Sequence, residues 1–324
     1  MKYLFTGISG FVGGHFVEHL LHEEKDCQII GISKHEPEFS FLEKNQADKI
    51  LTYQISLLDQ EAIEDLLFTI KPDYIIHLAS YSSVAFSWEF PVESFMNNTN
   101  IFLNMVEAVR KIGISAKILS VGSSEQYGIV DPKTIPIDEG TLLNPINPYA
   151  VARVAQENLS QVYYKGYGIP VICTRSFNHV GPRQSDTFVI SSFVKQAVEI
   201  KTGLRNKLIC GDTSIVRDFI DVRDVVGAYY QLLKKGREGQ VYNICSGKGY
   251  RLSEVIEVIK AVLGVEFEIE IEKSFIRPVD NPVIIGSNRK LSEEVQFCTK
   301  YELHDSIRDI GKYWSEVLAG YYFF

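Results

Sequence analysis

The chain has 324 residues, 45% of them hydrophobic, and carries a formal net charge of −8. A chain of this length and composition can bury a large core, either as one large domain or as two closely joined domains. Its acidic balance argues against nucleic acid or an anionic membrane as the main partner, and no apolar run is long enough to span a bilayer.

The first predicted elements are a strand at Lys2–Thr6 and a helix at Phe11–Glu23, joined by a glycine-rich turn rather than forming an export peptide. Glycines spaced GxxGxxG allow a tight turn, close approach of the backbone to phosphates and close helix–strand packing. The helix N-terminus adds N–H groups and a positive dipole end, so the turn predicts a dinucleotide pyrophosphate site. A purely structural turn is the alternative. The residues expected at the dinucleotide are Gly7, Gly10, Phe11, Val12 and Gly13.

Apolar strand-like runs and amphipathic helical stretches alternate through the first half of the chain. This alternation predicts an α/β fold, a doubly wound parallel sheet of the Rossmann type with helices on both faces. Further strands are expected at Gln28–Ile32, Ile50–Gln54, Tyr74–Leu78, Lys117–Val121 and Pro170–Thr174. Further helices are expected at Asp59–Ile70, Asn98–Ile112 and Tyr149–Tyr167, and an irregular surface segment at Ser33–Asp48.

The second half is less regular and predicts a smaller α/β domain that binds the substrate. Its expected helices and strands are Phe188–Lys201, Val222–Lys235, Leu252–Leu263 and His304–Leu318, with Lys207–Cys210, Val241–Ile244 and Glu266–Ile271. The boundary is expected in the loop Ser176–Thr187. It divides the chain into a dinucleotide-binding domain at 1–175 and a substrate-binding domain at 176–324, with segments of the latter returning to the first sheet.

Polar side chains gather where the predicted strands end, which is where doubly wound sheets bind ligands. The segment 77–80 follows one strand, and the loop 122–128 follows the next. Tyr149 and Arg153 are four residues apart and share one helical face. A phenol beside a fixed cation is an acid/base unit, because the cation favours the phenolate. A solvated pair on a helix surface is the alternative.

A family resemblance is carried by four segments in order: TGISGFVG (6–13), HLAS (77–80), SSEQYG (123–128) and YAVAR (149–153). The chain resembles the extended short-chain dehydrogenase/reductases, Rossmann-fold enzymes that act on nucleotide sugars. Four more segments are similar to the GDP-mannose branch of 4-keto-6-deoxymannose reductases and 4,6-dehydratases. They are FNHVGPRQ (177–184), VRDFIDVRD (216–224), YNICSG (242–247) and IRPVDNP (276–282).

The resemblance implies a catalytic set. It assigns Ser123 or Ser124 as the hydroxyl that hydrogen-bonds the sugar 4-oxygen, and Tyr149 as the phenol that exchanges a proton with it. Arg153 stands where the family has lysine, and its guanidinium is planar, bulkier and permanently charged. Arg153 can still supply positive potential beside Tyr149, whereas its contact with the cofactor ribose is in doubt.

Three functions stay open. The first is NAD(P)-dependent hydride transfer at C4 of a GDP-linked mannose-type sugar, either a hexose or a heptose. The enzyme would be a 4-keto reductase or C4 dehydrogenase that supplies surface-polysaccharide precursors. The second is a GDP-mannose-type 4,6-dehydratase, in which Glu125 would remove the C5 proton. Related reductases share this Glu, and segment 33–48 lacks the paired arginines of mannose dehydratases. The third, suggested by Arg153, is a catalytically weakened sugar-nucleotide binder or regulator.

Ligand contacts follow from the same resemblance. Ser33 and Lys34 offer no carboxylate to a ribose 2′-hydroxyl and Lys34 could meet a 2′-phosphate, which tilts the choice toward NADP and leaves NAD open. The other implied cofactor contacts are Leu78, Ala79, Ser80, Tyr149 and Arg153. The implied substrate contacts are Asn178 and His179 near sugar and pyrophosphate, and Arg183, Arg217 and Arg277 at the nucleotide phosphates.

The resemblance also implies a homodimer through helices 98–112 and 149–167, and a structural role for Asn98. No metal site is expected, because the shared face of His15, His19 and His22 should be solvated. The five cysteines are scattered, odd in number and without a CxxC pair, which favours reduced thiols in the cytoplasm.

Overall fold

The computed structural model describes residues 1–37, 39, 42, 44–275 and 281–320. Arg277, most of segment 276–282 and the aromatic tail 321–324 therefore lie outside the described residues. Within the described residues, no helix combines the length and the apolar character that a bilayer span needs.

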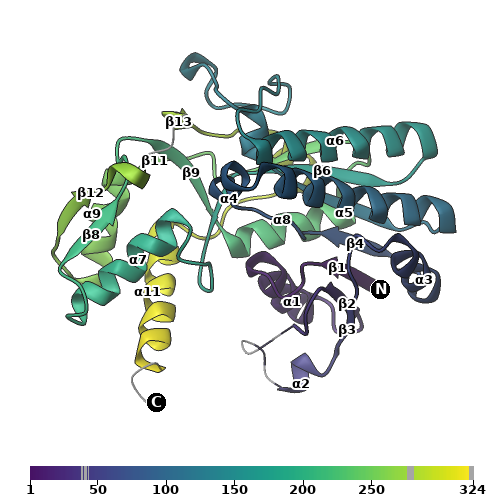
Figure 1. Ribbon diagram of the computed structural model, residues 1–324, viewed down its shortest axis with the longest axis horizontal. Helices are drawn as coiled ribbons and strands as arrows, with labels where there is room; N and C mark the ends of the chain where they lie inside the picture. The colour runs from purple at the N-terminus through teal and green to yellow at the C-terminus, as the bar shows by residue number, and fades with distance from the viewer. Residues whose placement is uncertain (38, 40–41, 43, 276–280, 321–324) are drawn as a thin grey trace.

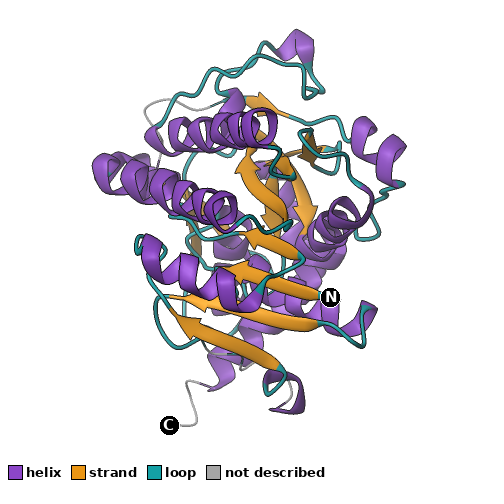
Figure 2. Cartoon of the chain, turned by 90° about the vertical axis from the view of Figure 1, so that its right-hand side faces the viewer, coloured by secondary structure: helices purple, strands orange, loops and turns teal. Residues whose placement is uncertain are grey.

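The larger sheet has seven strands in the order β10-β6-β5-β4-β1-β2-β3, and every described pairing in it is parallel. Figure 2 shows these strands stacked with helices on either side. The strand order reverses at β1, and in doubly wound sheets the ligand-binding crevice lies at such a point, here the carboxyl ends of β1 and β4. The strands are β1 Lys2–Thr6, β2 Gln28–Ser33, β3 Ile50–Gln54, β4 Tyr74–His77, β5 Lys117–Ser123, β6 Val171–Ser176 and β10 Val241–Ile244.

Alternating side chains of these strands build two separate cores. Tyr3 and Phe5 of β1 face one core, which is covered by helices α1 and α8. Leu4, between them, faces the other core, which is covered by α3, α5 and α6. These helices are α1 Phe11–Glu23, α3 Gln60–Ile70, α5 Pro91–Ile112, α6 Pro148–Tyr167 and α8 Val222–Lys235. The predicted doubly wound α/β fold is confirmed.

A smaller domain lies at the left of Figure 1, beyond the carboxyl ends of the large sheet. Helices α7, α9 and α11 enclose its core together with β8 and β9. Its helices and strands are α7 Val189–Lys201, α9 Leu252–Leu263, α11 Leu303–Gly320, β7 Asn178–Val180, β8 Lys207–Cys210, β9 Val216–Asp221, β11 Gly249–Arg251, β12 Glu268–Ile271 and β13 Val283–Ile284. The short elements are α2 Lys44–Ala47, α4 Val84–Glu89, α10 Arg289–Val295, η1 Ser124–Tyr127, η2 Pro132–Thr134 and η3 Lys273–Phe275.

Two predicted segments differ from the structure. Residues 178–180 were expected within a loop, yet they form β7, because β9 pairs with them in parallel register. The helix expected to begin at Asn98 begins at Pro91, whose fixed φ and missing N–H suit the first helical turn. The first difference adds a strand to the smaller domain, and the second lengthens α5 by seven residues.

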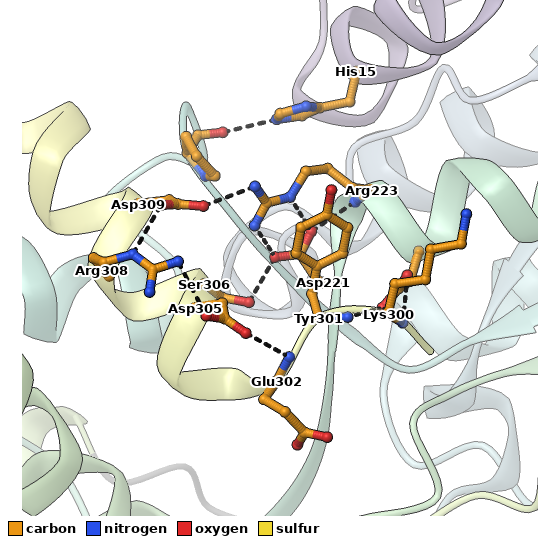
Figure 3. A network of polar contacts seen from close by, with 12 residues as sticks. His15, Asp221, Arg223, Lys300, Tyr301, Glu302, Asp305, Ser306, Arg308 and Asp309 are labelled. Atoms are coloured by element: carbon orange, nitrogen blue, oxygen red, sulfur yellow. Dashed lines mark hydrogen bonds and ion pairs between the residues drawn. The ribbon is translucent and has the colours of Figure 1, made fainter. Parts of the chain in front are cut away.

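Charged side chains tie α8 to α11, as Figure 3 shows. Asp221 caps α8 by accepting from the backbone N–H of Arg223 at 2.8 Å, and it also accepts from Ser306 Oγ at 2.6 Å. Arg223 donates to Asp309 at 2.7 Å and stacks on the ring of Tyr301. Segment 216–224 therefore fixes how the smaller domain sits against the first sheet.

Candidate active site

The glycine-rich turn lies at the crevice between β1 and β4. Gly7 has φ of +75°, and a Cβ there would lie 3.0 Å from the backbone nitrogen of Ala79. A Cβ at Gly13 would lie 2.5 Å from the carbonyl oxygens of both Gly7 and Ile8. Gly10 is the N-cap of α1 and provides no side-chain cap. The first turn of α1 is thus packed tightly against β1, with its N–H groups directed toward the crevice.

The segment after β4 is held close to this turn. Ala79 donates its N–H to Thr6 Oγ1 at 3.2 Å, and His77 Nδ1 lies 3.1 Å from the same hydroxyl. Asn98 Oδ1 accepts from Tyr81 N at 2.8 Å and its Nδ2 donates to Tyr81 O at 3.0 Å. Asn98 therefore has the expected structural role, because it fixes the loop that contains Leu78–Ser80.

The turn after β5 orients its side chains through its own hydrogen bonds. Ser123 Oγ accepts from Glu125 N at 3.2 Å, and Gln126 Oε1 accepts from Ser123 N at 2.9 Å. The Ser123 hydroxyl uses a lone pair in its bond, so its proton remains available for an acceptor on a ligand. Ser124 is buried, whereas Ser123 is half-buried at the strand end. The geometry therefore favours Ser123 as the hydroxyl of the site.

Tyr149 and Arg153 meet within the first turns of α6. Both side chains are buried, and the guanidinium carbon lies 5.2 Å from the centroid of the Tyr149 ring. Arg153 Nη1 donates to Val121 O at 3.1 Å and to Gln156 Oε1 at 2.6 Å. The structure thus rejects the alternative of a solvated surface pair.

The positive charge of Arg153 reaches the end of β4. Burial, and to a smaller extent the positive charge of Arg153, lower the pKa of His77 to about 3. His77 is completely buried, and its Nε2 has no hydrogen-bond partner among the described residues. His77 is therefore neutral at physiological pH and helps to pack the site without carrying charge.

The substrate residues expected in the second half surround the start of the smaller domain. Asn178 Nδ2 donates to Asp218 O at 3.2 Å, and His179 Nε2 is enclosed without a partner among the described residues. Arg183 forms a bidentate pair with Glu18 of α1 at 2.5 and 2.8 Å. Arg217 is buried and donates to the carbonyl of Asn281 at 2.7 Å. Their contacts with a nucleotide sugar remain predictions.

A family model described as GDP-mannose 4,6 dehydratase matches residues 4–310. The GDP-6-deoxy-D-mannose reductase of Pseudomonas aeruginosa is 33% identical over 310 residues, which cover 95% of each chain. The chain belongs to the GDP-mannose 4,6-dehydratase family. The predicted membership of the extended short-chain dehydrogenase/reductases is thereby confirmed, and the protein is an NAD(P)-dependent enzyme that modifies a nucleotide sugar.

One further relative of this dehydratase family and one solved structure extend the comparison. The GDP-6-deoxy-D-talose 4-dehydrogenase of Aggregatibacter actinomycetemcomitans is 27% identical over 293 residues, covering 90% of each chain. The solved structure of RMD from Pseudomonas aeruginosa complexed with NADPH has a TM-score of 0.86 and 32% identity, covering 98% of this chain and 100% of that chain.

A nicotinamide cofactor, which the dehydratase family implies, fits the residues present. Gly7 and Gly13 leave no room for a Cβ where the backbone of α1 faces the crevice. The buried atoms Ser80 Oγ and Arg153 Nε have no hydrogen-bond partner among the described residues. Buried polar atoms normally have partners, so both atoms identify places where ligand oxygens would be accommodated.

Several residues that support the dehydratase-family site were not found from the sequence. Asn147 caps α6 by accepting from Ala150 N at 2.8 Å, and its Nδ2 donates to Glu125 at 2.9 Å. Glu157 of α6 pairs with buried Arg175 of β6 at 2.7 Å and accepts from Gln126 at 2.8 Å. An asparagine directly before a proline is a helix-start signal, so Asn147 was detectable. The Glu157–Arg175 pair had no local signal.

The histidine face of α1 differs from expectation. His15 is buried rather than solvated, because its Nε2 lies 3.0 Å from the carbonyl oxygen of Pro182. Within the described ranges no cluster of three or more His, Cys, Asp or Glu side chains could hold a metal ion. All five cysteines are free.

Neutral His77 makes stability depend on pH. Its pKa in the folded protein is about 3, below the ordinary value of 6.5. Between these two pH values the unfolded chain therefore binds a proton that the folded chain does not. Stability is therefore complete above pH 6.5 and decreases as the pH falls toward 3. Relative to His77→Gln, wild type should lose about 2 kcal/mol of unfolding free energy between pH 6.5 and 4.5, measured by denaturant titration. An unchanged difference between the two proteins would show that His77 is protonated in the fold.

Asp218 holds two other backbone segments, at residues 246–247 and at residue 286, against its own strand. Its two oxygens accept from Ser246 N at 2.9 Å, Ser246 Oγ at 2.7 Å, Gly247 N at 3.0 Å and Gly286 N at 3.2 Å. Asp218→Asn would turn an amide NH₂ toward these donors, and we expect a loss of about 3 kcal/mol in unfolding free energy. The control Asp212→Asn, at an exposed turn, should stay within about 0.5 kcal/mol of wild type. Equal stability of the two variants would contradict this role of Asp218.

Proposed function

We propose that this enzyme reduces the 4-keto group of a GDP-linked 6-deoxymannose-type sugar, using NADPH. The observation that carries the proposal is the buried Tyr149–Arg153 pair beside the Ser123 turn, at the carboxyl ends of β4 and β5. The GDP-6-deoxy-D-mannose reductase relative, which aligns along 95% of both chains, supports the choice of sugar and of reaction.

Tyr149, Ser123 and Arg153 have different roles in the reaction at the sugar 4-oxygen. When bound, the nicotinamide supplies the hydride that is added to sugar C4. The Tyr149 phenol gives its proton to the 4-oxygen, and Ser123 donates a hydrogen bond to the same atom. Arg153, held beside the Tyr149 ring, stabilises the negative charge that remains on the phenol oxygen. The reverse direction, oxidation at C4, uses the same residues in the opposite sense.

NADPH is preferred over NADH in this proposal because of the residues after β2. Ser33 ends β2 and donates to the carbonyl of His35, and exposed Lys34 follows it. Neither residue offers the carboxylate that binds a ribose 2′-hydroxyl, whereas Lys34 can pair with a 2′-phosphate. The NADPH complex of the P. aeruginosa relative supports the same choice.

A 4,6-dehydratase is the second candidate, because Glu125 is held in the site. Its carboxylate accepts from Asn147 Nδ2 at 2.9 Å, which ties it to the first turn of α6 close to Tyr149. A carboxylate fixed there could take the C5 proton of a 4-keto sugar. A catalytically weakened binder or regulator ranks third. Arg153 is buried against Tyr149, where its charge can still act on the phenol, and its Nε has no partner among the described residues.

We also propose a homodimer in the cytoplasm. Helices α5 and α6 pack side by side and present exposed apolar side chains, namely Val92, Phe95, Met96, Val151 and Val162. A four-helix interface of two copies would cover them. Free thiols suit the reducing cytoplasm.

The function is tested by incubating the enzyme with GDP-4-keto-6-deoxymannose and NADPH, and separately with GDP-mannose without reductant. The proposal predicts consumption of NADPH in the first reaction and an unchanged mass of GDP-mannose in the second. Loss of one water from GDP-mannose, with no NADPH consumption in the first reaction, would establish the dehydratase instead.

A further inference from the structure

Arg153 is oriented by one neighbouring side chain. Its Nη1 donates to the backbone carbonyl of Val121 and, more closely, to Gln156 Oε1 at 2.6 Å. The Nε on the other side of the guanidinium is buried and has no hydrogen-bond partner among the described residues. The hydrogen bonds that hold the guanidinium are therefore made at Nη1, and its Nε makes none with the described residues.

The orientation of the Gln156 amide is itself determined. Its Nε2 donates to the carbonyl of Val121 at 3.1 Å and to Ser120 Oγ at 2.9 Å, and the side chain is almost completely buried. A carbonyl can only accept, so the NH₂ of Gln156 must face Val121. Its oxygen is then left to face Arg153.

We infer that Gln156 is the positioning residue that allows an arginine to do the work of a lysine in this site. The inference rests on the proposed function of Tyr149 and Arg153. A lysine ammonium is compact and rotates among its partners, whereas a guanidinium is planar and longer, so it needs an acceptor that sets its plane. Gln156 is such an acceptor, three residues after Arg153 and therefore on the same side of α6.

The amide also suits the electrostatics of the site. A neutral acceptor orients Arg153 while leaving its positive charge available to Tyr149 and to the cofactor. A carboxylate at the same position would still accept from Arg153, but it would neutralise that charge and would lose the donation to the Val121 carbonyl. Gln156 therefore orients Arg153 without cancelling its positive charge. Substitutions at position 156 can separate these two effects.

A double-mutant cycle tests this inference. The four proteins are wild type, Gln156→Met, Arg153→Lys and the double variant, and each is assayed for NADPH affinity by fluorescence titration and for kcat and KM of the keto sugar. We expect Gln156→Met alone to weaken NADPH binding several-fold and to lower kcat about tenfold, with KM for the sugar nearly unchanged. In the Arg153→Lys background the same substitution should change both quantities less than about twofold, because lysine does not use Gln156.

A second variant keeps the test valid if Gln156→Met folds poorly. Gln156→Glu has the same size and retains the acceptor, and we expect it to lower kcat more than NADPH affinity, since orientation persists and charge is lost. Equal losses from Gln156→Met in both backgrounds, or full activity of Gln156→Glu, would overturn the inference. NADPH binding is measured without sugar. The effect of Gln156 on NADPH affinity can therefore be judged even if the proposed sugar substrate is wrong.

Discussion

Replacing Tyr149 by phenylalanine should lower the rate of hydride transfer by a factor of about 10² to 10⁴, because the site loses the group that exchanges a proton with the sugar 4-oxygen. The ring is buried and packs against Arg153, and phenylalanine preserves both contacts. We therefore expect NADPH to bind with nearly unchanged affinity and the fold to be retained. Single-turnover kinetics and an NADPH titration measure the two quantities on the same preparation.

Tyr163→Phe on the same helix is the matched control. Its hydroxyl donates to Glu107 at 2.8 Å, on the face of α6 that packs against α5 and about four turns beyond Tyr149. Removing that hydroxyl should cost about 1 kcal/mol of stability and leave kcat unchanged. Near-normal turnover of Tyr149→Phe would remove Tyr149 from the catalytic role.

Replacing Gly13 by alanine should lower NADPH affinity at least tenfold and destabilise the protein by about 1–3 kcal/mol. The new Cβ would lie 2.5 Å from the carbonyl oxygens of Gly7 and Ile8, and these backbone atoms cannot move without opening the turn. The first turn of α1 would then shift away from β1, and with it the N–H groups expected to meet the pyrophosphate. Titration calorimetry with NADPH and denaturant unfolding check the two effects.

Gly227→Ala is the control for this variant. Gly227 lies inside α8, and a Cβ there would meet no atom within 4 Å. Alanine is the better helix former, so this variant should be neutral or up to about 1 kcal/mol more stable and should bind NADPH normally. NADPH affinity that is equal in Gly13→Ala and Gly227→Ala would contradict the role assigned to the turn.

The sequence predicted the features that local patterns encode. The GxxGxxG turn requires glycine because of contacts within a few residues, and the expected strand before it and helix after it are present. Tyr149 and Arg153 share a helical face, so their pairing followed from spacing alone. The alternation of strands and helices was sufficient to predict the doubly wound sheet.

The features that escaped prediction depend on contacts between distant segments. In the sequence Gln156 is an ordinary polar residue of a helix. Its role depends on Ser120 and Val121 of β5, which lie against it in the fold. Asp218 lies in β9, and its partners come from residues 246, 247 and 286. Arg183 was predicted to meet phosphates, and the structure adds its pairing with Glu18, 165 residues away in the chain. Such pairings have no signature in local sequence.

The central claim is that the hydride of bound NADPH is delivered to C4 of a GDP-linked keto sugar while Tyr149 delivers the proton. It is tested most directly with NADPH that carries deuterium at nicotinamide C4 on the transferred face, followed by NMR of the product sugar. The account predicts one deuterium at sugar C4 in wild type and none above background in Tyr149→Phe. A product without deuterium at C4, or equal labelling by the two proteins, would contradict it.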